Sequence, residues 1–284
     1  MSGCDGGGDV VVIKLLVGKT KDGLTLLKRM HKLKDLMLKN GWHVHHTNNS
    51  IITYDTLRGS NLVILPNPQC DFNLEEKDAV AKYINDGGSL LILSNEGGGD
   101  ASGSINNILQ DQYNININND SLIRPVHHPM YHHPKEVIIT VSGNIGSSGN
   151  KSVMTRRRSD DRHTSLCIIY PFGATLSSCS SAPPRNERAT SPSTTGRILF
   201  HSGQLSYPMH RPLCLTTSSS SAAAAGGGGK VCVLGSHMLF TDEYIHREDN
   251  LILADNIISF LVEGTTSPQQ PDLLFTIKGT VVAI

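Results

Sequence analysis

Apolar residues near the start of the chain change from an unbroken run to a helical spacing. Residues 10–17 read VVVIKLLV, a β-rich run of the kind that is buried on both faces of a parallel sheet. After it, apolar residues recur at steps of four, three and four, which places them on one side of a single predicted helix: Leu26, Met30, Leu33 and Met37. Asn40 and Gly41 provide the stop signal for that helix.

The same alternation continues between residues 61 and 113. Residues 61–66 (NLVILP) predict a short strand, and residues 74–86 predict a helix with signals at both ends. Asn73 caps its first turn, Glu76 reaches back to the cap, and Gly87 takes the left-handed position that ends it. A strand, a glycine turn and a further helix are predicted next, over residues 89–94, 95–100 and 105–113.

The pattern returns near the end of the chain. Residues 230–236 (KVCVLGS) predict a strand, and a helix follows with Glu248 and Asp249 in its first turn and Gly264 at its stop. One apolar stripe runs along this helix: Leu251, Ala254, Ile258 and Leu261. Strand–helix–strand steps of this length predict the α/β class, with a doubly wound, mainly parallel sheet flanked by helices.

The middle of the chain, residues 114–217, is β-rich. Its short runs EVIITVSG, SLCIIYPFG, RILFHSG and PLCLTT predict an antiparallel extension of the same sheet. Low-complexity insertions near 144–164, 177–196 and 218–229 interrupt the order. They are rich in Ser, Gly, Pro and charge and carry too little apolar surface to offset the entropy of ordering. We therefore interpret all three as mobile insertions, and the last, a homopolymeric tract between two predicted strands, as an elongated loop and not a domain boundary.

Charge and cysteine usage narrow the class of protein. The chain has 284 residues, with 25 Lys and Arg against 25 Asp and Glu, so no net charge attracts it to nucleic acid or an anionic membrane. In the run RRRSDDR at 156–162 two aspartates directly follow three arginines, and we interpret it as a solvated loop. Six cysteines without a CxxC pair indicate neither a disulfide framework nor a thiolate zinc site, and favour a reducing compartment. The first residues lack a basic n-region and no apolar run reaches about 18 residues, so we expect neither a signal peptide nor a membrane span.

Candidate chemistry gathers where the predicted strands end. A hydrolase would use Ser94 as nucleophile, His237 as base and Asp242 as the orienting acid, and a thiol enzyme would use Cys70 with His237. Neither nucleophile sits between glycines, as a nucleophile elbow requires. The turn NEGGGD at 95–100 lacks the spacing of known phosphate-binding loops, and Glu96 would place a carboxylate beside the anion. A tight turn into the next helix is the better interpretation.

Histidines form a second conspicuous pattern. The stretch VHHPMYHHPKEV holds His127, His128, His132 and His133, and prolines 129 and 134 forbid the regular helix that would converge them on a metal. We predict a polar loop that leads into a strand over residues 136–142. A further group, His43, His45 and His46, alternates along a β-like run and predicts a solvent-facing strand edge.

Several motifs, taken in order, carry a resemblance to a known family. They are YINDGGSLLILSNEGGGD, HPKEV, YPFGATLS, HRPLCL and GGKVCVLGSHMLFTDEYIHREDN. Together they resemble the amino-terminal GIFT domain of the intraflagellar transport protein 52 family, in register from about Val10 to Gly264 apart from the three insertions. The resemblance implies a fold similar to the class I glutamine amidotransferase and Rossmann-like folds. We expect residues 1–264 to form this domain and residues 265–284 to begin an extended linker to a further C-terminal region.

The resemblance also implies a function. We expect a noncatalytic scaffold or assembly domain of a subunit of intraflagellar transport complex B, required for assembly of cilia and flagella, with no catalytic, cofactor-binding or metal-binding residues. The expected partners are other complex B subunits, several of them bound through the C-terminal region, with no nucleic acid and no membrane insertion. The expected location is the cilium or flagellum and the basal body, on the cytoplasmic, reducing side.

Two other classes of function stay open from the residues alone. One is a small-ligand or carbohydrate-binding domain at the edge formed by NEGGGD and GSHMLF, and the other is a hydrolase or amidotransferase. The crevice at the sheet's carboxyl edge distinguishes them. A binding domain needs an open pocket with convergent polar groups, whereas a scaffold can fill the crevice with its own side chains.

Overall fold

A computed structural model describes residues 11–98, 102–142, 165–178, 197–218 and 229–262. A seven-stranded sheet runs through it in the order β2-β1-β3-β4-β11-β10-β9. The strands of this sheet are β1 Val12–Leu16, β2 His43–Thr47, β3 Leu62–Pro66, β4 Ser89–Leu93, β9 Arg197–His201, β10 Pro212–Ser218 and β11 Lys230–Leu234. The first five strands of the order are parallel, and β10 is antiparallel to both of its neighbours. The predicted α/β class with a mainly parallel sheet is confirmed.

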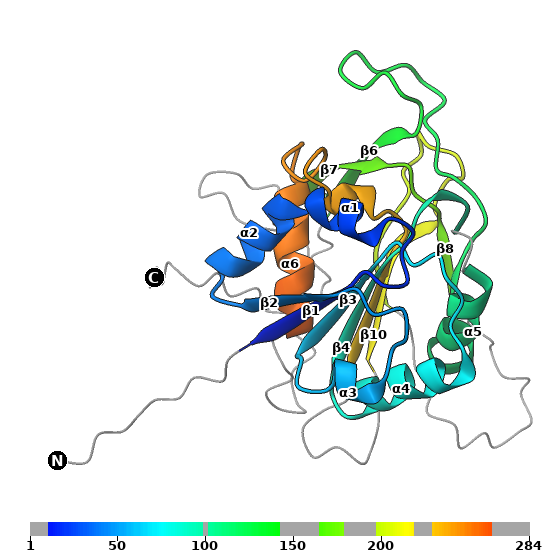
Figure 1. Ribbon diagram of the computed structural model, residues 1–284. Coiled ribbons are helices and arrows are strands. Elements are labelled where there is room, and N and C mark those ends of the chain that lie inside the picture. The colour runs from blue at the N-terminus through cyan, green and yellow to red at the C-terminus, as the bar shows by residue number, and fades with distance from the viewer. Residues whose placement is uncertain (1–10, 99–101, 143–164, 179–196, 219–228, 263–284) are drawn as a thin grey trace, which may run out of the picture.

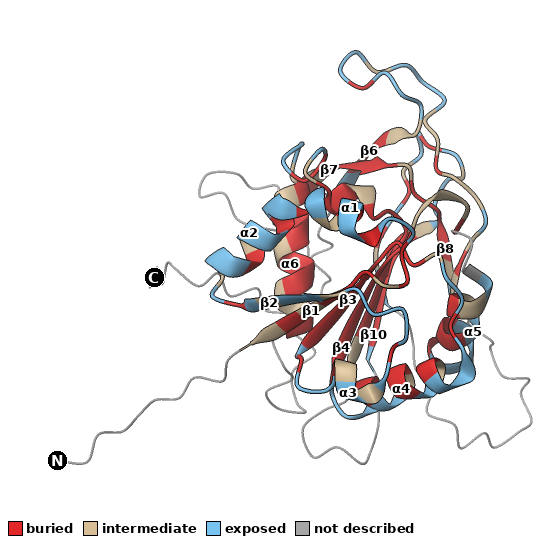
Figure 2. Cartoon of the chain, in the orientation of Figure 1, coloured by how far each residue is buried: buried red, intermediate tan, exposed pale blue. Residues whose placement is uncertain are grey.

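Helices cover both faces of the sheet (Figure 1). They are α1 Gly23–Lys28, α2 His31–Lys39, α3 Tyr54–Leu57, α4 Leu74–Asn85, α5 Ser102–Tyr113 and α6 Asn250–Val262, with short 3-10 turns η1 Glu96–Gly98 and η2 Met238–Phe240. The apolar sides of α1, α2 and α6 share one core cluster with the sheet, and those of α3, α4 and α5 share another. Figure 2 shows the central strands buried between these two layers. No helix of the described segments is long and apolar enough to cross a membrane.

Helix α4 forms as the local signals predict. The Asn73 side chain accepts a hydrogen bond from the Glu76 amide at 2.8 Å, and the Glu76 carboxylate accepts one from the Asn73 amide at 2.9 Å. Gly87, with φ 96°, ends the helix where an L-residue would be strained. The prediction of residues 74–86 is confirmed within one residue, because Asp86 is the C-cap.

The predicted single helix through Leu26 and Met37 is wrong. The chain forms two helices, α1 and α2, with the break at Arg29 and Met30. The apolar stripe survives the break, since Met30 and Met37 are both buried in the same core cluster. The spacing therefore identified the buried face correctly and missed the interruption. The Asp242 carboxylate causes it by accepting hydrogen bonds from the amides of His31 and Lys32 at the start of α2.

The β-rich middle section extends the sheet only in part. Strands β9 and β10 are the predicted antiparallel extension, but β6 Glu136–Ser142 and β7 Ser165–Pro171 form a separate antiparallel pair. Alternate residues of this pair, among them Val137, Ile139 and Ile168, pack into the core cluster that α1, α2 and α6 cover. The pair therefore packs on the side of the core that α1, α2 and α6 cover, with β7 against α6 and η2, instead of joining the edge of the large sheet. Two further short strands, β5 Ile115–Ile117 and β8 Leu176–Ser178, also pair apart from it.

Helix α6 begins later than predicted. It starts at Asn250, so Glu248 and Asp249 precede the first turn. Both carboxylates serve other elements: Asp249 accepts a hydrogen bond from the Cys167 amide at 2.9 Å, and Glu248 accepts one from the Tyr131 hydroxyl at 2.7 Å. The predicted stop at Gly264 and most of the three insertions lie outside the described residues, and the boundaries 1–264 and 265–284 stay predictions.

Candidate functional site at the carboxyl edge of the sheet

Open α/β sheets bind ligands beyond the carboxyl ends of their strands, where the strand order reverses. In the order β2-β1-β3-β4-β11 the reversal falls between β1 and β3. The segments that follow these two strands therefore define the place where a ligand would be expected. Gly18 follows β1, and a Cβ there would lie 1.8 Å from the Asn49 carbonyl oxygen, so this exit requires glycine.

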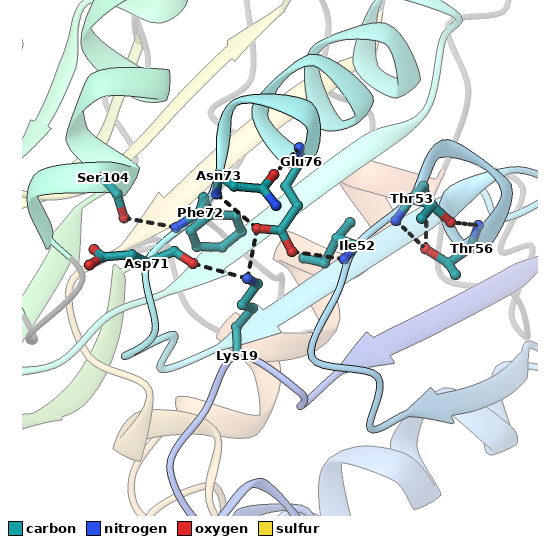
Figure 3. Close-up of polar contacts among 9 residues, drawn as sticks. All are labelled: Lys19, Ile52, Thr53, Thr56, Asp71, Phe72, Asn73, Glu76 and Ser104. Carbon is teal, nitrogen blue, oxygen red and sulfur yellow. Dashed lines mark hydrogen bonds and ion pairs between the residues drawn. The ribbon is translucent and has the colours of Figure 1, made fainter.

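Lys19 lies at this reversal point, between the segments that follow β1 and β3 (Figure 3). Its ammonium donates to the Glu76 carboxylate at 2.7 Å and to the Asp71 carbonyl oxygen at 2.9 Å. The Lys19 side chain is 8% exposed and that of Glu76 2%. The Lys19 carbonyl oxygen in turn accepts from the amides of Gln69 and Cys70. The two loops are thus bound to each other, and a lysine side chain lies where a ligand would enter.

Glu76 is the hub of this arrangement. Besides Lys19 it accepts hydrogen bonds from the amides of Ile52 and Asn73, each at 2.9 Å. Burial by itself raises the pKa of Glu76, but the hydrogen bonds from Lys19, Ile52 and Asn73 outweigh it and leave the pKa below its ordinary value. The carboxylate is therefore charged at neutral pH and joins three segments of the chain.

Phe72 closes the crevice from the side of the loop after β3. Its ring is buried, and the Lys19 ammonium lies 5.2 Å from the ring centroid. Its amide is oriented toward the Ser104 hydroxyl of α5 at 3.3 Å (Figure 3). This part of the carboxyl edge is filled by the chain's own side chains. The groove nearby, about 310 Å³ in volume between residues 51–54 and α4, opens on the outer surface beside Glu76 and not at the strand ends.

Ser94 and His237 do meet at the ends of β4 and β11, but without catalytic geometry. The His237 amide donates to the Ser94 carbonyl oxygen at 2.6 Å, and the ring nitrogen Nδ1 lies 3.2 Å from the same oxygen. The Ser94 hydroxyl is oriented toward the Gly98 carbonyl oxygen at 3.5 Å. Burial lowers the pKa of His237 to about 4, with a smaller contribution from the charge of Arg29. The His237 imidazole is therefore neutral at pH 7 and buried, and it contacts the backbone of Ser94.

Asp242 does not orient that imidazole. Its carboxylate accepts hydrogen bonds from the amides of His31, at 3.3 Å, and Lys32, at 2.8 Å, and so caps the start of α2. Its own amide donates to the Arg29 carbonyl oxygen at 2.6 Å. A residue far along the chain therefore holds the break between α1 and α2, and the Ser94–His237–Asp242 triad is not assembled. Cys70 is exposed, and its amide donates to Lys19.

The glycine turn after β4 uses its amides within the protein. The amides of Glu96, Gly97 and Gly98 donate to the carbonyl oxygens of Phe172, Asp120 and Asn95 respectively. The Glu96 carboxylate accepts from the Ser121 hydroxyl and pairs with the Lys135 ammonium. None of these three amides is left to bind a phosphate, and the described part of the turn, residues 95–98, is consistent with the predicted tight turn, while residues 99 and 100 lie outside the described residues.

The histidine stretch forms a loop before β6. His128 and His133 each accept a hydrogen bond on Nδ1 from a backbone amide two residues further on, at 3.2 Å and 3.1 Å. The rings of His127 and His132 lie 6.2 Å apart. Nowhere in the segments that the structure describes do three or more His, Cys, Asp or Glu side chains gather as a metal site would need. His43, His45 and His46 are exposed on the edge strand β2, as predicted.

The Lys19–Glu76 pair is the feature that sequence reasoning missed. Glu76 was identifiable as a capping residue, but its ion pair joins positions 57 residues apart. Only the adjacency of β1 and β3 brings them together. A lysine two residues after the apolar run 10–17, at the carboxyl end of a predicted strand, was the one local sign of it.

The fold and this edge define a class: a doubly wound, mainly parallel α/β domain whose reversal-point crevice is occupied by its own buried ion pair. The family is shown by comparison. The chain belongs to the IFT52 GIFT domain family, whose model matches residues 14–272. The sequence is 28% identical over 248 residues to the intraflagellar transport protein 52 homolog of Homo sapiens. This alignment covers 85% of this chain and 52% of the human protein. The chain therefore spans about half the length of the curated relatives it matches.

Solved structures agree with this assignment. The mmIFT52 N-terminal domain superposes with a TM-score of 0.70 at 26% sequence identity, over 90% of this chain and 99% of that domain. A cytoplasmic protein of Salmonella typhimurium LT2 gives a TM-score of 0.53 at 10% identity, over 88% of this chain and 99% of its own, and shares the fold alone. The resemblance read from the motifs is confirmed.

Proposed function

We propose that this chain is a noncatalytic assembly domain of an intraflagellar transport complex B subunit, required for building cilia and flagella. Membership of the IFT52 GIFT domain family supports a role in the intraflagellar transport machinery. The observation that carries the noncatalytic part is the buried Lys19–Glu76 ion pair at the reversal point of the sheet. A fold of this class binds small molecules there, and here the place is taken.

Energetics favour a crevice that stays closed. Removing one partner of a buried ion pair costs about 3–5 kcal/mol, because the other charge is left without compensation. A ligand that displaced Lys19 from Glu76 would have to supply that energy before gaining any affinity. Such a domain therefore binds its partners through its outer surface. We propose that these partners are other complex B subunits at the cilium, flagellum and basal body.

The candidate nucleophiles support the same proposal. Ser94 is buried and its neighbouring imidazole contacts a carbonyl oxygen, so neither group is arranged to exchange a proton with the other. Cys70 is exposed, and within the described segments its backbone amide donates to the Lys19 carbonyl oxygen and no imidazole is its hydrogen-bond partner. No cofactor is part of the proposal, and neither nucleic acid nor membrane is proposed as a partner.

A binding experiment tests the proposal. The full 284-residue chain is immobilised, and each purified complex B subunit is passed over it singly. We expect saturable binding of at least one subunit. Chain unfolded in urea and then re-immobilised without refolding serves as the control for adhesion to exposed apolar surface. If no subunit binds the folded chain better than this control, the assembly role is refuted.

A further inference from the structure

Exposed apolar side chains are concentrated on two segments, residues 121–135 and 197–212, which we call the paired-loop surface. Ten large apolar side chains are exposed among the described residues, and six of them belong to these two segments. They are Val126, Met130, Ile198, Leu205, Tyr207 and Met209. Tyr207 is 65% exposed, Met130 70% and Leu205 72%. Apolar side chains gathered in this way indicate an interaction surface, whereas single ones need no explanation.

The two segments are joined to each other through backbone. Ile123 and Tyr207 exchange both of their hydrogen bonds, at 2.9 Å and 2.8 Å, as one antiparallel bridge. Val126, Leu205 and Met209 lie within three positions of this bridge, whereas Met130 and Ile198 lie seven and nine positions from it along their segments. In Figure 1 the segment that leads into β6 projects from the body of the domain, and Figure 2 shows it largely exposed.

Each loop is also closed internally. The Arg124 amide donates to the Pro134 carbonyl oxygen at 2.7 Å, and the Arg124 guanidinium donates to the Tyr131 carbonyl oxygen at 2.7 Å. On the other segment the Ser202 hydroxyl donates to the Pro208 carbonyl oxygen at 2.7 Å and accepts from the Arg211 amide at 2.9 Å. Loops fixed in this way lose little conformational entropy when a partner binds.

The two segments of the paired-loop surface are basic, and the carboxylates that contact residues 121–135 come from outside them, from Glu96, Glu136 and Glu248. Neither segment contains an aspartate or a glutamate, although the chain as a whole has equal numbers of acidic and basic residues. The segments carry Arg124, Lys135, Arg197 and Arg211, and six of the thirteen histidines of the chain. Lys135 is paired with Glu96, and Arg124 with a backbone oxygen, which leaves Arg197 and Arg211 as the exposed permanent charges.

We propose that the paired-loop surface docks an acidic, apolar segment of a partner protein. Tyr, Met and Arg are enriched in protein interfaces while Lys, Asp and Glu are depleted, and this surface has that composition. Exposed methionines adapt to a partner's shape. The exposed Arg197 and Arg211 favour a partner that supplies carboxylates. An anionic membrane is the weaker fit, because electrostatic membrane binding uses clusters of about 4–8 Lys or Arg, and two of the four on this surface, Lys135 and Arg124, are bound within the protein.

The inference rests on the proposed function for the identity of the binding partner, and matched variants test it. The apolar variant is Met130→Ser with Leu205→Ser and Tyr207→Ser. Its control is Leu24→Ser with Ile51→Ser and Leu74→Ser, which removes three equally exposed apolar side chains elsewhere. Each full-length variant is titrated with the purified complex B subunits singly. We expect the apolar variant to weaken the Kd of one subunit at least about tenfold and the control to leave it within about twofold.

A second pair of variants tests the charge. Arg197→Glu with Arg211→Glu should slow association with that subunit and reduce its dependence on salt. The control, Lys34→Glu with Lys39→Glu, makes the same change of charge on exposed positions of α2. Photo-crosslinking from position 207 should then label a peptide of the subunit that is rich in Asp, Glu and apolar residues.

Four outcomes would overturn the inference. If a subunit binds wild type and the apolar variant alike, the surface is not its site, although the assembly role stands. If no subunit binds wild type, the assembly role fails and the inference fails with it. If the apolar variant instead abolishes flotation with phosphatidylserine-containing vesicles, the surface binds membrane. If it abolishes only self-association in sedimentation, the occupant is a second copy.

Discussion

The buried pair at the reversal point predicts a large effect from a small substitution. In Glu76→Gln the side chain keeps its shape but loses its charge and one acceptor oxygen. Glu76 accepts from Lys19, Ile52 and Asn73 through two oxygens, and an amide can replace only one of them. Its NH₂ group would face either the Ile52 amide or the Asn73 amide and the Lys19 ammonium, so two donors oppose each other in every orientation.

The magnitude follows from the burial of both partners. The side chains are 8% and 2% exposed, so solvent cannot replace the lost carboxylate around the Lys19 ammonium. Breaking a buried pair by removing one charge costs about 3–5 kcal/mol. Domains of this kind are stable by about 5–15 kcal/mol, so the variant should lose a large part of its free energy of unfolding.

Urea unfolding followed by circular dichroism measures this loss. The control is Glu75→Gln, an exposed carboxylate in the same helical turn, which should change the free energy of unfolding by less than about 0.5 kcal/mol. Lys19→Met and the double variant complete a thermodynamic cycle, in which residues in direct contact should show a coupling energy above about 1 kcal/mol. Equal stabilities of the Glu76→Gln and Glu75→Gln variants would refute the buried-pair reasoning.

Three further predictions concern other parts of the domain. The pKa of His237 is about 4 in the fold against an ordinary 6.5, so the neutral imidazole contributes about 3 kcal/mol to the free energy of unfolding. This contribution is fully present above pH 6.5 and is lost as the pH falls toward 4. His237→Asn should therefore flatten the pH dependence of the free energy of unfolding in urea, and an unchanged slope would contradict the burial argument. Gly87→Val should cost at least about 1 kcal/mol in thermal unfolding because φ is 96°, whereas Gly103→Val, with open space around its Cβ, should not. Ser94→Ala and Cys70→Ala should each support cilium assembly in cells that lack the natural protein. Failure of either well-folded variant would indicate an enzyme, and so would stoichiometric labelling of Ser94 or Cys70 in the wild-type protein by a serine- or cysteine-reactive probe.

Local signals predicted the elements whose stability is local. Helix α4 carries its cap, its capping-box partner and its terminal glycine within its own sequence, and it forms as predicted. Strands β3 and β4 are continuous apolar runs, and both are buried on two faces of the sheet. In these cases hydrophobic burial, backbone geometry and capping favour the same conformation, so a short window of sequence is sufficient.

The incorrect predictions share a long-range cause. The stripe through Leu26 and Met37 fits one helix, but Asp242 binds the amides of His31 and Lys32 and the carbonyl oxygen of Arg29, which makes a second helix start favourable. Strands β6 and β7 have the apolar alternation of sheet strands, and the face they pack against depends on what the rest of the core leaves uncovered. Periodicity reports which side of an element is apolar, and not which partner covers it.

The sequence by itself determined the class of fold, the mainly parallel order of strands and helices, the lack of a glycine-flanked nucleophile and, through its motifs, the family. Tertiary structure alone decided that Lys19 meets Glu76, that Asp242 caps a helix instead of orienting His237, and that residues 121–135 and 197–212 form one surface. The physical reason is distance along the chain. Hydrogen-bonded turns and amphipathic faces are encoded within a few residues, whereas a buried ion pair or a shared surface exists only after strand order has placed remote segments side by side.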